Sequence, residues 1–204
     1  MRVRKKKHCA ERLQACSSLF LRKEDTEGRD FCCLEIGCGK GAFIEGTARK
    51  YPERFFIGVE KVPDVLVTAM EKINGSEINN IRFLCEDAGA LADILGEGSV
   101  KIIYLNFSDP WPKKKQAKRR LTSPGFLEVY KKILSEDGEI RFKTDNAPLF
   151  EYSVEEISNN GFEIKEITRD LPPEGLDGEN VMTEYEKNFR SQSVKINYLR
   201  AIKK

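Results

Sequence analysis

The sequence predicts an α/β protein built on a seven-stranded, mostly parallel sheet, with one antiparallel strand and helices on both faces. From Phe31 onward, short apolar runs alternate with longer amphipathic segments, as expected for repeated strand–helix units. The runs are almost continuously apolar, which is typical of parallel strands that helices bury on both faces. The last two runs have no clear helix between them, so one of the last two strands should run antiparallel.

Seven apolar runs are the expected strands, and turn residues mark where several of them begin. The first leads into a glycine-rich turn, the fourth has almost no polar residue, and the seventh alternates between apolar and polar side chains. The turn dipeptides Asp137-Gly138 and Asn160-Gly161 precede the fifth and the sixth. The runs are Phe31–Ile36, Phe55–Val59, Ile81–Leu84, Ile102–Phe107, Glu139–Lys143, Phe162–Thr168 and Val194–Ile202.

Four helices are expected between these strands, at about Ala42–Lys50, Asp64–Ile73, Pro124–Leu134 and Leu149–Asn159. Pro63 leads into the second helix, and proline suits a helix start because the N–H that it lacks would have no partner there. The segment Leu171–Phe189 is long, polar and rich in Pro and Gly. It is therefore expected to be a loop that is either functional or disordered.

Length and composition indicate a single domain over residues 1–204, in which residues 1–30 form a basic segment before the first core strand. No apolar run approaches the roughly 18 residues that span a membrane, and no apolar stretch follows the basic N-terminus as in a signal peptide. A cytoplasmic protein, monomeric or homodimeric, is expected. Six cysteines without a Cys-x-x-Cys pair, and a single histidine, favour reduced thiols and no metal site.

The net charge is only +2, but the basic residues are clustered. One cluster is Arg2–Lys7, and in the other, Lys113–Arg120, six of eight residues are Lys or Arg. A solvated loop is the ordinary explanation for such a run. A local basic patch beside a reactive site is instead typical of nucleic-acid binding, because contacts with phosphates release counterions.

A glycine-rich turn follows the first strand, in Glu35-Ile36-Gly37-Cys38-Gly39-Lys40-Gly41. The glycines Gly37, Gly39 and Gly41 let the chain turn sharply and let a ligand approach the backbone. Glu35 would repel a pyrophosphate but suits the cationic end of a sulfonium amino acid. Glu60 ends the second strand nineteen residues beyond Gly41, where a carboxylate can bind both ribose hydroxyls of a nucleoside.

Asp87 follows the third strand, at a position suited to an adenine amino group. Any α/β sheet can have turn glycines and strand-end acids, but three such features at three successive strand ends favour a nucleotide site. The spacing is Gly-x-Gly-x-Gly, not the Gly-x-Gly-x-x-Gly of dinucleotide folds. A nicotinamide cofactor is therefore the weaker alternative to a nucleoside that carries a sulfonium amino acid.

The segment Asn106-Phe107-Ser108-Asp109-Pro110-Trp111-Pro112 follows the fourth strand, and its two prolines restrict the backbone. The order of motifs resembles the Rossmann-like class I methyltransferases, in which this position faces the methyl group. Trp111 could stack on a base or cap the core, and the sequence leaves both readings open.

The chain resembles the bacterial tRNA (guanine-N7)-methyltransferases over essentially its whole length. The residues that carry the resemblance are Glu35–Gly41, Asn106–Arg120, Phe142–Asn146 and Met182–Glu186. The resemblance implies that Glu35, Glu60, Asp87 and Asp109 contact the methyl donor S-adenosylmethionine. It also implies that the acceptor tRNA contacts Lys113, Asp145, Thr183, Glu184, Tyr185 and Glu186. The basic run adds Lys114, Lys115, Lys118, Arg119 and Arg120 as predicted RNA contacts. Gln116 stands where the family commonly has histidine.

The acceptor chemistry explains why no nucleophile–base set is expected. Guanine N7 has an exposed lone pair and no proton to lose, so the enzyme must mainly align the reacting atoms. The methylated base becomes cationic, and Asp109 is predicted to stabilise that growing charge as the catalytic residue, with Asp145 and Glu186 orienting the guanine edge. The family's target lies in the tRNA variable loop (position 46) and would have to leave its stack. The alternatives are a class I methyltransferase with another acceptor, and a non-catalytic RNA-binding protein.

Overall fold

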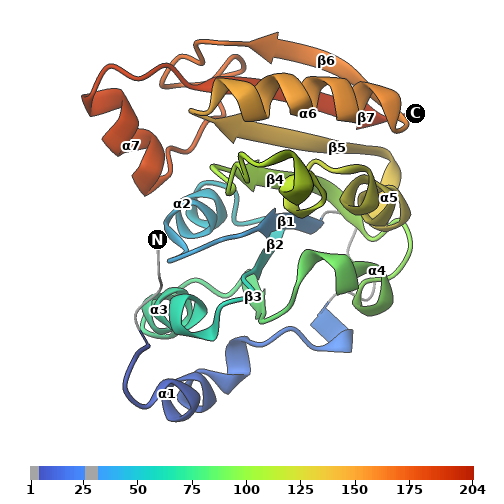
Figure 1. Cartoon of the computed structure of the whole chain (residues 1–204). Helices are drawn as coiled ribbons and strands as arrows, with labels where there is room; N and C mark the ends of the chain where they lie inside the picture. Colours follow the sequence, from blue (N-terminus) through green and yellow to red (C-terminus); the bar gives the residue numbers. More distant parts are fainter. Residues whose placement is uncertain (1–4, 26–31) are drawn as a thin grey trace.

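The protein forms a seven-stranded sheet with helices on both faces, as seen in a computed structural model that describes residues 5–25 and 32–204 (Figure 1). The strand order is β3-β2-β1-β4-β5-β7-β6. The strands are β1 (Cys32–Ile36), β2 (Phe55–Val59), β3 (Ile81–Leu84), β4 (Val100–Asn106), β5 (Leu134–Thr144), β6 (Phe162–Thr168) and β7 (Asn197–Lys203).

One strand runs against the others. β1 to β5 pair in parallel, whereas β7 pairs antiparallel with both β5 and β6. The predicted fold class, mostly parallel with one antiparallel strand, is thus confirmed, and β7 is that strand. Because β1 to β5 are parallel, their carboxyl ends meet along one edge, where open α/β sheets bind ligands.

Helices cover both faces of the sheet, and each face has its own apolar core. Figure 1 shows α1, α2 and α3 on one side and α4 and α5 on the other. The helices are α1 (Cys9–Ala15), α2 (Ala42–Lys50), α3 (Pro63–Asn74), α4 (Leu91–Ile94), α5 (Pro124–Ile133), α6 (Ala147–Asn159) and α7 (Glu184–Ser191). Short 3-10 turns lie at Ser17–Leu19, Lys23–Asp25, Ala88–Ala90 and Lys114–Arg119.

Several boundaries differ from those that the sequence predicts. β5 begins at Leu134, directly after α5, and Asp137-Gly138 forms an irregularity in its pairing with β4 instead of a turn before it. β4 ends at Asn106, since Phe107 has a left-handed backbone (φ +50°). Helix α7 begins within Leu171–Phe189, which the sequence predicts to be a loop, and extends two residues beyond it. The predicted strand start at Phe31 and the basic residues Arg2–Arg4 lie outside the described residues.

The N-terminal helix α1 packs along α3. Arg12 donates two hydrogen bonds to the Glu71 carboxylate, at 2.7 and 2.6 Å, and the backbone N–H of Lys6 donates to Asp64 at 2.6 Å. These contacts place the described part of the basic N-terminal segment, Lys5–Lys7, beside α3.

Candidate active site

The glycine turn after β1 has one side open to a ligand and one side packed. Gly37, Gly39 and Gly41 all have left-handed backbones, with φ of +76°, +57° and +77°. A Cβ at Gly37 would meet nothing within 4 Å, whereas one at Gly41 would lie 2.8 Å from the Cβ of Ala69 on α3. The first glycine therefore leaves the backbone accessible, and the third allows α2 and α3 to pack closely.

Glu35, at the end of β1, is a buried carboxylate with an unused oxygen. Its Oε1 accepts a hydrogen bond from the Asn106 side-chain amide at 3.1 Å. Within residues 5–25 and 32–204, Oε2 of Glu35 and Oδ1 of Asn106 have no partner, although both atoms are buried. Burial raises the pKa of Glu35 to about 8, despite the opposing effects of Asn106 and Lys143. Such a group favours a ligand that brings a positive charge or hydrogen-bond donors.

Glu60 and Asp87 occupy the next two strand ends, as the sequence predicts. Glu60 accepts the backbone N–H of Val62 at 2.9 Å through one oxygen, and Asp87 accepts that of Gly89 at 3.0 Å. Each contact uses one carboxylate oxygen and fixes the direction of the side chain. The three acids thus follow three neighbouring parallel strands along one edge, at increasing distance from the centre of the sheet.

The loop Phe107–Trp111, named the acceptor loop after its predicted role, begins where β4 ends, and it is bounded by two strained residues. Phe107 and Trp111 have positive φ angles of +50° and +42°, a backbone conformation that residues other than glycine rarely adopt. The backbone N–H of Phe107 still donates to the Lys143 carbonyl at 2.8 Å. Asp109, between the two, is exposed, and its carboxylate makes no hydrogen bond or ion pair with the described part of the chain. This carboxylate is therefore available to a substrate.

Lys143 and Glu186 form a buried ion pair that joins β5 to α7. The Lys143 ammonium donates to Glu186 Oε2 at 2.8 Å, to Asn180 Oδ1 at 2.9 Å and to the Val181 carbonyl at 3.2 Å. Burial lowers the pKa of Lys143. Burial alone would raise the pKa of Glu186, but Lys143 and Arg190 hold it below its usual value. Because three acceptors surround the ammonium, we assign the pair its charged form.

Glu186 is therefore an anchor within the protein. It is fully buried, and its Oε1, the oxygen that does not bind Lys143, accepts hydrogen bonds from Asn180 and Arg190. The sequence predicts that Glu186 contacts the substrate; the described contacts of its carboxylate are all with residues of the chain, and they hold α7 against β5.

Helix α7 brings aromatic side chains onto the acceptor loop. Thr183 caps the helix, its hydroxyl accepting the Glu186 N–H at 2.8 Å. The Phe107 ring stacks with Tyr185 and Phe189, with centroid distances of 6.5 and 5.8 Å. Tyr185 is 64% exposed, so one aromatic ring of this cluster faces solvent beside the loop that carries Asp109. Glu184 next to it is exposed as well.

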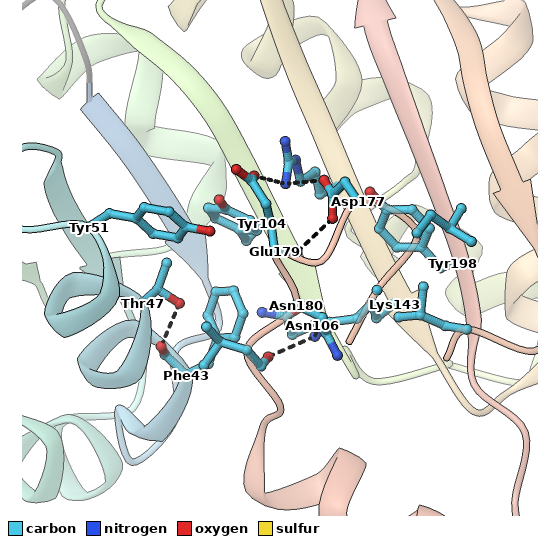
Figure 2. A pocket seen from close by; sticks show the side chains of 15 residues that line it. Phe43, Thr47, Tyr51, Tyr104, Asn106, Lys143, Asp177, Glu179, Asn180 and Tyr198 are labelled. Carbon is cyan, nitrogen blue, oxygen red and sulfur yellow. Dashed lines mark hydrogen bonds and ion pairs between the residues drawn. The ribbon is translucent and has the colours of Figure 1, made fainter. Parts of the chain in front are cut away.

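A cleft lies between the sheet, α2 and residues 171–181, and Figure 2 shows Tyr51 and Tyr198 on opposite sides of it. Asn106 and Lys143 belong to its lining, so the cleft extends beneath the carboxyl edge. Arg141 on β5 pairs with Glu179 at 3.3 Å and Asp177 at 3.5 Å, which fastens residues 171–181 over the sheet. No sequence pattern reveals Arg141 or its partners, because the pairing depends on the path of a loop.

The basic run occupies a 3-10 turn beside the acceptor loop, and its members are not equivalent. Lys113, Lys114, Lys115, Lys118 and Arg119 are exposed. The guanidinium carbon of Arg119 nevertheless lies over the Trp111 ring, 4.0 Å from its centroid. Arg120 is partly buried. Asp145, half-buried, follows β5 at the same edge. The chain thus brings the predicted donor residues, Asp109, Asp145 and the exposed cations to one edge of the sheet.

Comparisons with known proteins agree with this arrangement. Residues 29–199 match the family described as "Putative methyltransferase". A tRNA (guanine-N(7)-)-methyltransferase of Streptococcus pyogenes is 44% identical over 201 residues, 94% of this chain and 95% of the relative. One from Macrococcus caseolyticus is 46% identical over 168 residues, 82% and 80% of the two chains.

The fold likeness extends to solved structures of low sequence identity. The aminoglycoside resistance methyltransferase NpmB1 has a TM-score of 0.66 and 17% identity, over 89% of this chain and 91% of its own. The fold is that of the Rossmann-like class I methyltransferases. In the described residues, no helix has the length and apolar character needed to cross a membrane.

Proposed function

This chain belongs to the family of the tRNA (guanine-N(7)-)-methyltransferases, and we propose that it transfers a methyl group from S-adenosylmethionine to N7 of a guanine in the tRNA variable loop. The observation that carries the proposal is the geometry of the acceptor loop. Its exposed Asp109 carboxylate follows Asn106, whose amide contacts the buried carboxylate of Glu35. A donor site and an anionic acceptor site are therefore only a few residues apart on one edge.

The residues at this edge fit the methyl donor. The unpartnered oxygen of Glu35 suits the donor's amino group, and Gly37 leaves the backbone open beside it. Glu60 would bind the ribose hydroxyls, and Asp87 the adenine amino group. When bound, S-adenosylmethionine supplies a methyl group on a positively charged sulfur, which needs no further activation.

The residues of the chain have two tasks in the reaction. They align guanine N7 with the donor, and they stabilise the positive charge that develops on the base. Asp109 performs the second task, because its carboxylate is exposed and uncommitted. Asp145, Thr183 and Tyr185 orient the guanine, while Glu186 holds α7 against β5.

The exposed cations of the basic run bind the tRNA backbone. Extracting a guanine from its stack costs on the order of a few kcal/mol, which contacts elsewhere must offset. Lys113, Lys114, Lys115, Lys118 and Arg119 are exposed beside the acceptor loop and can provide phosphate contacts. Since its proposed substrate is tRNA, we place the enzyme in the cytoplasm. We also expect it to be a monomer or homodimer.

An assay for N7-methylguanosine in unmodified tRNA tests the proposal. Asp109→Ala should lower the single-turnover rate at saturating tRNA and donor by roughly 100-fold or more, the range found for preorganised charge stabilisers. Asp93→Ala, which removes an exposed carboxylate on α4, is the matched control and should retain the wild-type rate. A near wild-type rate for Asp109→Ala would exclude its catalytic role. Absence of N7-methylguanosine with the wild-type enzyme would exclude the function itself.

A further inference from the structure

Arg120 differs from the other cations of the basic run in what it contacts. Its Nε donates to the Pro110 carbonyl and its Nη2 to the Trp111 carbonyl, both at 3.1 Å. The guanidinium also lies over the Tyr152 ring of α6, 4.3 Å from its centroid. Arg120 is partly buried, whereas the neighbouring Lys118 and Arg119 are exposed. The contacts of Arg120 therefore face the protein.

The two carbonyls that Arg120 binds belong to the strained half of the acceptor loop. Trp111 has φ +42°, a conformation that only surrounding contacts can maintain in a residue with a side chain. Trp111 has a second contact, because the Arg119 guanidinium lies over its ring. At the other end of the loop, the strained Phe107 is held by the rings of α7. Each strained residue thus has its own support.

Asp109 lies between these two supports and has none of its own. Because its side chain makes no hydrogen bond or ion pair with any described residue, the backbone of the loop sets the range of positions that its carboxylate can reach. A change in the Pro110 or Trp111 peptide would move Asp109 directly. The position of the charge therefore depends on the contacts that hold those peptides.

We propose that Arg120 is a positioning residue, which fixes the Asp109 loop by binding the Pro110 and Trp111 carbonyls, and is not an RNA phosphate contact. The proposal rests on the function proposed above for Asp109. A planar guanidinium can donate in parallel from Nε and Nη2 to two adjacent acceptors. A lysine ammonium keeps the charge but cannot reproduce this geometry, so Arg120→Lys separates the two roles.

The experiment compares four proteins: wild type, Arg120→Lys, Lys118→Gln and Lys132→Gln. Lys118→Gln removes an exposed cation of the basic run, and Lys132→Gln removes an exposed cation of α5 as the matched control. Single-turnover methylation at saturating tRNA reports the reaction, and tRNA affinity between low and high salt reports the number of phosphate contacts. Trp111 is the only tryptophan of the chain, so acrylamide quenching of its fluorescence reports the loop without any activity.

Arg120→Lys should lower the single-turnover rate at least 10-fold and increase quenching of Trp111 fluorescence. The slope of log tRNA affinity against log salt concentration (the salt slope) should stay unchanged. Lys118→Gln should reduce the salt slope by about one unit or less without affecting Trp111, and Lys132→Gln should change neither. A wild-type rate and wild-type quenching in Arg120→Lys would overturn the proposal. If the wild-type enzyme formed no N7-methylguanosine while Arg120→Lys still exposed Trp111, the proposed function would fail and the loop contact would stand.

Discussion

We expect donor binding to depend on pH through Glu35, by an amount that follows from the pKa of its carboxyl group. Without a ligand, burial raises the pKa of this carboxyl group to about 8, so at neutral pH it is mostly protonated. The donor's ammonium group favours the ionised form, because opposite charges in contact stabilise each other at a buried site. Binding should therefore release a proton, and affinity should rise as the pH rises toward 8.

The size of the effect follows from the pKa. If the carboxyl is fully ionised in the complex, the apparent affinity for the donor should increase about 30-fold between about pH 5.5 and pH 7. Near pH 7 about 0.9 proton should be released for each donor molecule bound. In this window the donor's own α-amino group, with a usual pKa of about 8, stays protonated.

Calorimetry in buffers of different ionisation enthalpy measures both the affinity and the number of protons released. The ligand is S-adenosylhomocysteine, the donor without its methyl group. Glu35→Gln should bind more weakly near pH 7 and lose the pH dependence, whereas the exposed Glu97→Gln should behave as wild type. An affinity that is flat over this range in wild type, or that retains its slope in Glu35→Gln, would refute the reasoning. The same shift in pKa affects stability: Glu35 loses its proton near pH 4.5 in the unfolded chain and near pH 8 in the folded protein. The contribution of Glu35 to the free energy of unfolding should therefore fall as the pH rises between these values.

Two further predictions concern the framework of the site. Lys143→Met removes one of the two cations that pair with the buried Glu186 carboxylate and should destabilise the protein by about 3–5 kcal/mol in urea unfolding; adding Glu186→Leu should recover most of that loss, and no recovery would contradict the role of the pair. Gly41→Ala must move Ala69 on α3 as well as strain the backbone, whereas Gly37→Ala meets only the backbone strain. Gly41→Ala should have a lower midpoint temperature of thermal unfolding than Gly37→Ala, and equal midpoints would be inconsistent with the close packing.

Much of the sheet could be predicted because its signals are local. The strands β2, β3 and β6 and the helix α2 have the predicted bounds, since short apolar runs between turns, and apolar residues at helical spacing, depend only on neighbouring residues. The edge carrying Glu35, Glu60 and Asp87 could be predicted for the same reason. Parallel strands place their carboxyl ends together whatever the loops do.

Helix α7 could not be predicted in this way, because its stability depends on distant partners. Its sequence is largely polar, and it begins in a segment whose Pro and Gly content is typical of a loop. What holds the helix is the ion pair with Lys143, more than forty residues away along the chain, together with aromatic contacts to Phe107. Neither partner has a fixed spacing that a sequence pattern could reveal.

The same dependence on distant contacts separates the roles of similar residues at the site. Asp109 and Glu186 are both acids of the predicted acceptor site, yet one is exposed and uncommitted and the other is fully buried and paired. A carboxylate that stabilises charge on a substrate must not already be neutralised by a cation of the protein. Lys143 and Arg190 pair with Glu186, so of these two acids Asp109 is the one whose charge is available to a substrate. The environment of each acid, and not its chemistry, therefore predicts a supporting role for Glu186 and, under the proposed function, a catalytic role for Asp109.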